Sequence, residues 1–216
     1  MSQLSRRFEL AYERARTDWT AGDPVRCAER AGCDLSPAGV LVPYFGRMHV
    51  VPHPDGEVTM AGTGQAVHQS IAIVLLHYLL TADGAPPAPL DLPPSDRWLN
   101  FRQLPDGLFY SQAFAGHAEG LLASRFGSDV DAFRVAAERT GGIVPGLPPG
   151  AGLAPPDAAY QFQAFPRLAV IVQVWAGDEE FPGRAQVLFE SHAGHYLPTE
   201  DLAGMGDWLA HKLSRA

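Results

Sequence analysis

The feature that most constrains the fold is the apolar run from Leu168 to Trp175, which is rich in β-branched and aromatic side chains. Such a run predicts a buried strand. A second strand is predicted over Ala185 to Phe189, and the intervening residues 177–183 (GDEEFPG) contain the glycines and the proline of a turn. The sequence therefore predicts an antiparallel hairpin with three acids at its tip.

Further strands are predicted elsewhere in the chain. From Tyr160 to Ala164, apolar side chains alternate with glutamines at the period of two that is typical of a half-buried strand. The runs Val40 to Phe45 and Met48 to Val51 predict another hairpin, and a short strand is expected at Trp98. We expect all of these strands to form one antiparallel sheet.

The segment Gln65 to Leu80 is apolar on nearly every side, so it predicts a central buried helix. Other helices are predicted over Leu4–Thr20, Asp23–Gly32, Phe114–Phe126, Asp129–Thr140 and from Thr199 to near the C-terminus. The expected fold is therefore α+β, with an antiparallel sheet packed against the central helix and with flanking N- and C-terminal helices.

The length of 216 residues predicts a single domain over 1–216, with surface loops rich in proline and glycine near 83–94 and 141–156. The net charge of −8 and the pI near 5.4 argue against a nucleic-acid partner and against an anionic membrane, since both bind basic surfaces. The longest apolar run, Ile71 to Leu80, is too short to span a bilayer. We expect neither a nucleic acid nor a membrane as partner.

The N-terminus is charged and has helical periodicity, so it is not expected to be a signal peptide. Two cysteines, Cys27 and Cys33, cannot form a disulfide framework or a four-thiolate metal site alone. A reducing cytoplasm is the simplest location for such a chain.

Common phosphate-binding, redox and hydrolase motifs are absent from the sequence, which disfavours those classes. His192 and His195, with Glu190 or the acids of the hairpin tip, could supply ligands to a divalent metal ion. A His-x-x-His pair is more often structural or exposed, so these two histidines are weak candidates and no metal site is predicted. The cofactor is left unassigned.

Three consecutive carboxylates, Asp178, Glu179 and Glu180, repel one another unless a cation lies close by. In an extended tip, Glu179 points to the opposite side from its two neighbours. At least one acid is therefore expected to face an arginine or histidine, for which Arg102, Arg167 and His195 are the candidates. The other interpretation is a solvated turn, which is the more common environment of a charge run.

Several segments resemble an uncharacterised family known as domain of unknown function 3786, which occurs in anaerobic bacteria and archaea. The resemblance is carried by LLHYL, WLNFRQLPDGLFY, FPR, WAGDEEFP, VLFE and HYLPTEDLA, which together extend over most of the chain. Where the family pattern has an aspartate after VLF, this chain has Glu190. The cysteine-rich iron–sulfur segment of some relatives is missing, so the resemblance implies no electron transfer and no established activity.

The first functional hypothesis is a cytoplasmic protein that binds a small molecule or cofactor, whether or not it is an enzyme. Its predicted site residues are His77, Trp98, Arg102, Tyr110, Arg167, Trp175, Asp178, Glu179, Glu180, His195 and Tyr196. The alternative is a non-catalytic interaction module whose acidic hairpin binds a protein. The sequence leaves the ligand, the reaction and the oligomeric state open.

Overall fold

The computed structural model describes residues 3–86, 93–145 and 155–216. Its backbone divides into two compact units. The first unit contains the chain up to Pro86 together with Ala164–Arg167 and His195–Pro198, and the second contains the remainder. The parts of the predicted surface loops at 87–92 and 146–154 lie outside the described residues. Folding of 1–216 as a single domain stays a prediction.

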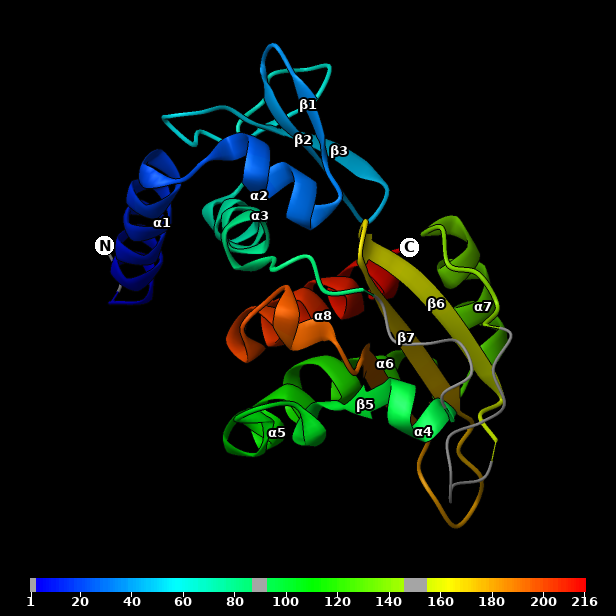
Figure 1. Cartoon of the computed structure of the whole chain (residues 1–216). Helices are drawn as coiled ribbons and strands as arrows, with labels where there is room; N and C mark the ends of the chain where they lie inside the picture. Colours follow the sequence, from blue (N-terminus) through cyan, green and yellow to red (C-terminus); the bar gives the residue numbers. More distant parts are fainter. Residues whose placement is uncertain (1–2, 87–92, 146–154) are drawn as a thin grey trace. The chain divides into compact units, whose positions relative to one another are not determined.

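The first unit combines three helices with a small antiparallel sheet (Figure 1). In chain order its elements are α1 (Gln3–Ala21), α2 (Pro24–Ala31), β1 (Asp34–Ser36), β2 (Gly39–Tyr44), β3 (Arg47–Val51), β4 (Thr59–Met60) and α3 (Gln69–Thr81). The strand order is β1-β2-β3-β4, with Tyr44 opposite Arg47 across the turn at Phe45 and Gly46. The predicted hairpin is confirmed.

Both ends of α2 follow from its sequence. The Asp23 carboxylate accepts hydrogen bonds from the amides of Val25 and Arg26, at 3.0 and 3.3 Å, and Pro24 occupies the first turn. At the other end Gly32 adopts a left-handed conformation with φ of 67°, which glycine does at little steric cost.

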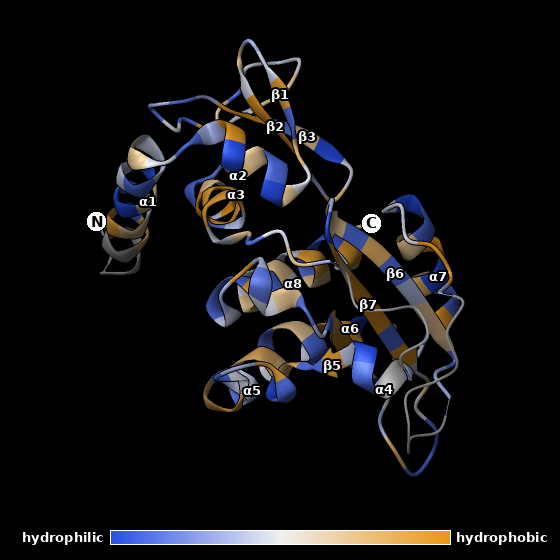
Figure 2. Cartoon of the chain, viewed as in Figure 1, coloured by the Kyte–Doolittle hydropathy of each residue, from blue (hydrophilic) through white to orange (hydrophobic). Residues whose placement is uncertain are grey.

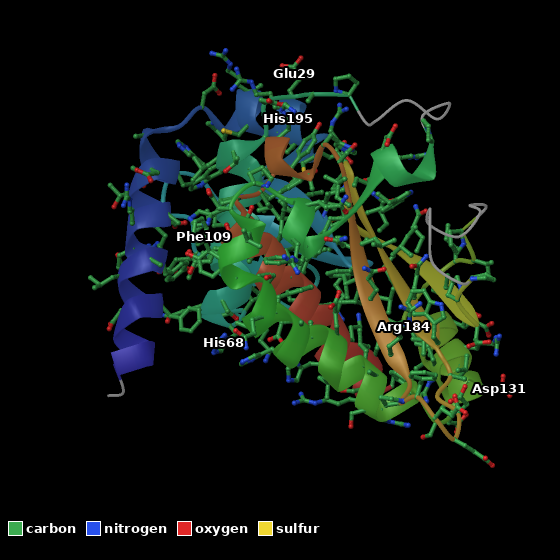
Figure 3. The ribbon with its side chains drawn as sticks, turned by 90° about the horizontal axis from the view of Figure 1, so that it is seen from below. Glu29, His68, Phe109, Asp131, Arg184 and His195 are labelled. Atoms are coloured by element: carbon green, nitrogen blue, oxygen red, sulfur yellow. The ribbon has the colours of Figure 1, made fainter. Side chains whose placement is uncertain are left out.

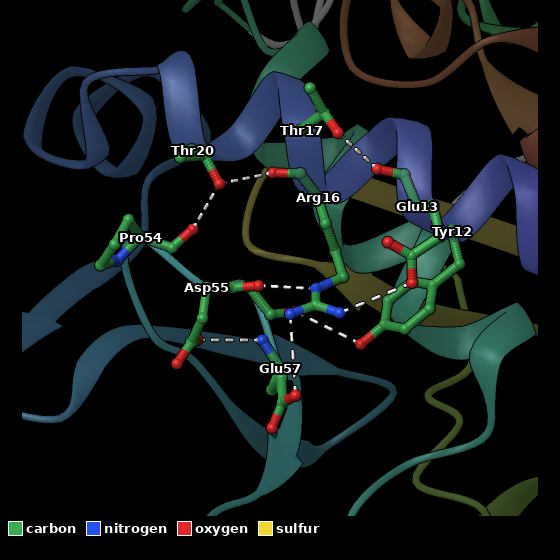
Figure 4. A network of polar contacts seen from close by, with 9 residues as sticks. Tyr12, Glu13, Arg16, Thr17, Thr20, Pro54, Asp55 and Glu57 are labelled. Carbon is green, nitrogen blue, oxygen red and sulfur yellow. Dashed lines mark hydrogen bonds and ion pairs between the residues drawn. The ribbon is translucent and has the colours of Figure 1, made fainter.

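The helix α1 is fixed to the segment that follows β3 by polar contacts (Figure 4). Arg16 donates from Nε to the carbonyl of Asp55 at 2.6 Å, and the Thr20 hydroxyl donates to the carbonyl of Pro54 at 2.7 Å. Trp19 is fully buried, and its indole N–H donates to the carbonyl of Pro52 at 2.8 Å. The helix α1 thus satisfies three backbone carbonyls of the non-helical segment 52–55.

The helix α3 is apolar on nearly every side, as Figure 2 shows, and it contacts both α1 and α2. It begins at Gln69, later than the predicted Gln65, because His68 caps it: His68 Nδ1 accepts a hydrogen bond from the Ser70 amide at 3.3 Å. The predicted central buried helix is therefore confirmed, with a shifted start.

Tyr78 on α3 connects three separate parts of the first unit. Its buried hydroxyl donates to the carbonyl of Ala31 at 2.7 Å and accepts from the amide of Arg167 at 3.2 Å. Its ring stacks on Phe165 with centroids 4.0 Å apart and lies nearly parallel to Tyr196 at 5.8 Å. These contacts hold residues 164–167 and 195–198 in the first unit.

The second unit combines a second sheet with several helices. Its elements are α4 (Pro94–Arg97), β5 (Trp98–Asn100), a 3₁₀ turn (Phe101–Gln103), α5 (Gly107–Phe114), a π-helical turn (Ala115–Glu119), α6 (Gly120–Phe126), α7 (Val130–Arg139), β6 (Ala158–Phe165), β7 (Leu168–Trp175), β8 (Arg184–Glu190), a 3₁₀ turn (Ala193–His195) and α8 (Thr199–Ser214). The last residues of β6 and of the second 3₁₀ turn already belong to the first unit. The predicted hairpin is confirmed as β7 and β8, which pair antiparallel from Val170–Phe189 to Trp175–Arg184.

The α+β class is confirmed, but the prediction of one sheet is wrong. The strand order of the second sheet is β5-β8-β7-β6, and none of the first four strands belongs to it. The physical reason is local pairing: β1 and β4 flank the β2–β3 hairpin, so that its backbone groups find partners on both sides. The residues from Gly107 form the helix α5, which contains Phe109 and Tyr110.

One face of the second sheet is covered by helices. Both α6 and α7 contact β7, α6 also contacts β8, and α8 packs against α5, α6 and α7. The valines at alternate positions of β7, together with Val187 and Phe189 of β8, are fully buried. The predicted helices over residues 114–126, 129–140 and 199 onward therefore form the layer that buries this face.

We predict that Tyr78→Phe lowers the free energy of unfolding by about 1–3 kcal/mol, because the buried carbonyl of Ala31 loses its donor. Tyr160→Phe is the matched control: its hydroxyl donates at 3.0 Å to the exposed Glu138, and water can replace that partner. Urea unfolding of both variants measures the difference. Equal losses for the two variants would show that the Tyr78 hydroxyl has no special structural role.

Candidate functional site

The face of the second sheet opposite α6 and α7 carries an apolar cluster with polar groups beside it. Register places Trp98 opposite Glu190, and Ile171 opposite Leu188. Because side chains alternate along a strand, these residues share one face with Ala169. Trp98, Ala169, Ile171 and Leu188 pack together as a buried apolar cluster. The cluster forms the floor of the candidate site.

Glu190 is a buried carboxylate at the end of β8. Its Oε2 accepts a hydrogen bond from the Ala169 amide at 2.7 Å, and His192 Nε2 lies 3.7 Å from the same oxygen. Burial raises the pKa of Glu190, although the Ala169 amide and the charges of His192 and Arg97 oppose the shift. The site therefore holds a carboxyl group that takes up a proton more readily than an exposed glutamate.

Three polar atoms around this carboxyl are buried without a hydrogen-bond partner in the part of the chain that the structure describes: Trp98 Nε1, Arg97 Nε and Asn100 Oδ1. The contrast with Trp19 is direct, because that buried indole donates to a backbone carbonyl. An unsatisfied buried donor or acceptor costs about 1–3 kcal/mol. Each such group requires a partner that the described residues do not supply, such as an ordered water or a bound molecule.

We call this group the Trp98 site and define it as Arg97, Trp98, Asn100, Glu190 and His192. Its parts come from the end of α4, from β5, and from the end of β8 with the residues after it. The amide of Ser191 donates to the carbonyl of Arg97 at 2.8 Å, which ties the two segments together. An apolar floor with a few directed polar groups is the usual composition of a small-molecule site.

A family model described as "Domain of unknown function (DUF3786)" matches residues 23–212. The chain belongs to the DUF3786 family. The match extends from the start of α2 into α8, so it includes every residue of the Trp98 site. Comparison with curated proteins gives no significant match, and comparison with solved structures gives none either.

The structure separates several of the predicted site residues that lie in the second unit. Trp98 is 5 % exposed and belongs to the Trp98 site. Trp175 is near the hairpin tip, six residues along β7 from Ala169, which corresponds to about 20 Å of strand. Arg102 and Tyr110 are exposed, in the first 3₁₀ turn and on α5. Trp98 and Trp175 therefore do not line one pocket.

At the hairpin tip, Asp178 accepts hydrogen bonds from the amides of Phe181 and Glu180, at 2.7 and 2.9 Å, which lower the pKa of its carboxyl. Glu179 and Glu180 are exposed, and neither forms an ion pair within residues 3–86, 93–145 and 155–216. The nearby Arg184 guanidinium lies 4.0 Å from the centre of the Trp175 ring. The solvated turn, and not the ion-pair network, is thus the interpretation that these contacts favour.

The other predicted site residues belong to the first unit. His77 is half-buried on α3, and Tyr196 is fully buried beside Tyr78. Arg167 lies against Gly32, where an added Cβ would come within 2.9 Å of the Arg167 Nε. His195 is paired with Asp83 at 2.6 Å. Of this set, the structure brings together Tyr196, His195 and the backbone of Arg167 around Tyr78 and Asp83.

The two weak metal candidates belong to different units: His192 lies in the second and His195 in the first. Among the side chains that the structure describes, no group of three or more histidines, cysteines and acids is arranged to hold a metal ion.

Sequence reasoning missed Arg97, Asn100 and Asp83 as site residues. One signal was present for the Trp98 site: Glu190 ends an otherwise apolar strand, where a charge is unusual. No local signal connects Asp83 with His195, because 112 residues separate them.

We predict opposite pH dependences for two carboxyl substitutions. The raised pKa of Glu190 means that the folded state binds its proton more tightly than the unfolded state does, so that wild-type stability falls as pH rises above the ordinary value of 4.5. Relative to wild type, Glu190→Gln should gain stability as pH increases through this range. The lowered pKa of Asp178 has the reverse sign, so that Asp178→Asn should lose stability relative to wild type above pH 3.8.

The measurement is urea unfolding of both variants and wild type between pH 3 and 7. If the free energy of unfolding relative to wild type changed with pH in the same direction for both variants, the environments of Glu190 and Asp178 described above would be contradicted.

The hairpin tip is fixed by a close glycine contact, which gives a further prediction. Gly177 donates to the carbonyl of Gly127 at 2.8 Å, and a Cβ added at Gly183 would lie 2.4 Å from the Gly127 Cα. Gly183→Ala should therefore cost about 1–3 kcal/mol through overpacking. Gly204→Ala on α8 meets nothing within 4 Å and should be neutral or stabilising. Thermal denaturation compares the two; a neutral Gly183→Ala would mean that the tip moves away from Gly127.

Proposed function

We propose that this DUF3786 chain is a cytoplasmic protein that binds a small polar molecule at the Trp98 site. The observation that carries the proposal is the group of buried, unsatisfied polar atoms on Arg97, Trp98 and Asn100. A bound molecule that supplies their hydrogen bonds removes a cost that the folded chain otherwise bears.

The donor and acceptor pattern limits the ligand. Trp98 Nε1 and Arg97 Nε are donors, so the ligand needs an acceptor such as a carbonyl or carboxylate oxygen. Asn100 Oδ1 is an acceptor and needs a donor from the ligand. The burial of Trp98 and Glu190 favours a small molecule over a polymer. The carboxyl of Glu190, with its raised pKa, serves as acceptor when ionised and as donor when protonated.

The alternative, a non-catalytic interaction module, rests on the hairpin tip. Phe181 is 68 % exposed beside the exposed Glu179 and Glu180, and an apolar ring next to acids suits a basic partner surface. A ligand that binds independently of the tip would favour the Trp98 site. If Phe181→Ala abolishes the binding of a partner protein and leaves ligand binding intact, the result would favour the interaction module.

Native mass spectrometry of gently purified protein, prepared without oxygen, tests the proposal. We expect a retained small molecule, or a rise in melting temperature with one member of a metabolite set, and we expect Trp98→Phe to abolish either effect. Trp208→Phe is the matched control, because it also removes one indole N–H, from a tryptophan on α8. The centre of the Trp208 ring lies 4.9 Å from Lys212 Nζ. Equal retention in Trp98→Phe and wild type would contradict the proposal.

A further inference from the structure

The first unit contains a histidine–carboxylate pair that the Trp98 site does not use. His195 Nδ1 and Asp83 Oδ2 are 2.6 Å apart, and both side chains are about half exposed, at 54 % and 51 %. The hydrogen bond from His195, and then that from the Ala85 amide, lower the pKa of the Asp83 carboxyl. Asp83 is therefore held as an ionised acceptor, and His195 donates to it from Nδ1.

The backbone around the pair is fixed from both sides. The Asp83 amide donates to the His195 carbonyl at 3.3 Å, and Asp83 Oδ1 accepts from the Ala85 amide at 2.8 Å. The next residue, Tyr196, is fully buried against Tyr78, and its hydroxyl donates to the carbonyl of Ala85. The imidazole is exposed, but its position is set by a buried neighbour.

This geometry determines the tautomer of neutral His195. With Nδ1–H donating to Asp83, the lone pair is on Nε2. No partner for Nε2 occurs among the residues that the structure describes, and the half-exposed ring leaves it accessible to solvent. In a reactive histidine of this kind, a carboxylate accepts the hydrogen bond from Nδ1 and so orients and stabilises the ring. The Nε2 lone pair is then exposed to the substrate.

Another exposed histidine of the first unit, His68, has the opposite arrangement. His68 Nδ1 accepts the Ser70 amide, so its neutral form carries the proton on Nε2. It is exposed as well, and it lies far from His195 in Figure 3. His68 is therefore an internal control. Its side chain is exposed, as that of His195 is, but its neutral form presents an N–H at Nε2 instead of a lone pair.

We propose that His195 and Asp83 form an acyl-transfer site, separate from the Trp98 site, in which His195 is the nucleophile and Asp83 is a positioning residue. The substrate class is an activated acyl compound. The Nε2 lone pair of His195 adds to the acyl carbon, and the bond from that carbon to its leaving oxygen breaks with release of the alcohol or phenol as its anion. Water then hydrolyses the acyl-imidazolium, which yields the carboxylic acid, restores neutral His195 and releases one proton, which the leaving alkoxide or phenoxide takes up. The positive charge on the imidazole during the first step is stabilised by Asp83.

The full chain can be tested with p-nitrophenyl acetate, which reports acyl transfer through nitrophenolate release. His195→Gln should remove most of the protein-dependent release, and His68→Gln should leave it unchanged. Asp83→Asn should lower it about tenfold or more, since an amide can donate to Nδ1 and so favour the wrong tautomer. Nitrogen-15 NMR of the imidazole should show Nδ1 protonated in wild type and a change of tautomer in Asp83→Asn. If the pair were purely structural, this change of tautomer would not be accompanied by a change in the rate of nitrophenolate release.

A measurement on unaltered protein covers the case in which a variant fails to fold. Carbethoxylation by diethyl pyrocarbonate, located by mass spectrometry, should modify His195 at least several-fold faster than His68. Equal rates at the two histidines, or nitrophenolate release that survives His195→Gln, would overturn the proposal. Neither result depends on a ligand at the Trp98 site.

Discussion

The first unit depends on the interaction of Tyr78 with three segments that are remote in sequence. A single side chain satisfies the carbonyl of Ala31 and the amide of Arg167 while its ring packs on Phe165 and Tyr196. Because residues 164–167 and 195–198 are held there, the chain passes repeatedly between the two units. The Asp83–His195 pair exists only because the second of these segments is in place.

The two faces of the second sheet differ in whether their polar groups find partners. The face with Val187 and Phe189 is buried by helices and supplies stability, at about 25 cal/mol for each Å² of apolar surface removed from water. The face with Trp98 and Glu190 is also buried but retains polar atoms without partners. Retaining these polar atoms without partners opposes folding, a cost that proteins commonly bear at binding sites and that is consistent with the ligand site proposed above.

Much of the local structure could be predicted from the sequence, because the signals are local: the apolar run of β7, the turn at Gly46, and the Asp23 and Gly32 ends of α2. The division into two sheets could not, because strand partners are chosen by long-range packing and not by strand propensity. The Trp98 site was only partly predictable. Trp98 was identified as an aromatic candidate, but its position opposite Glu190 depends on the β5–β8 register.

The most direct test of the Trp98 site is the indole N–H signal of Trp98 in proton–nitrogen NMR spectra. Protein as purified would be compared with protein unfolded, dialysed and refolded without small molecules, with the Trp19 signal as an internal reference because that indole donates to Pro52 in either case. If a ligand accepts the hydrogen bond from Trp98 Nε1, its removal should move the Trp98 signal upfield, while the Trp19 signal stays. A Trp98 signal that is identical in both samples, with the downfield position of a hydrogen-bonded indole, would show that the chain itself satisfies this group and would contradict a ligand site at Trp98.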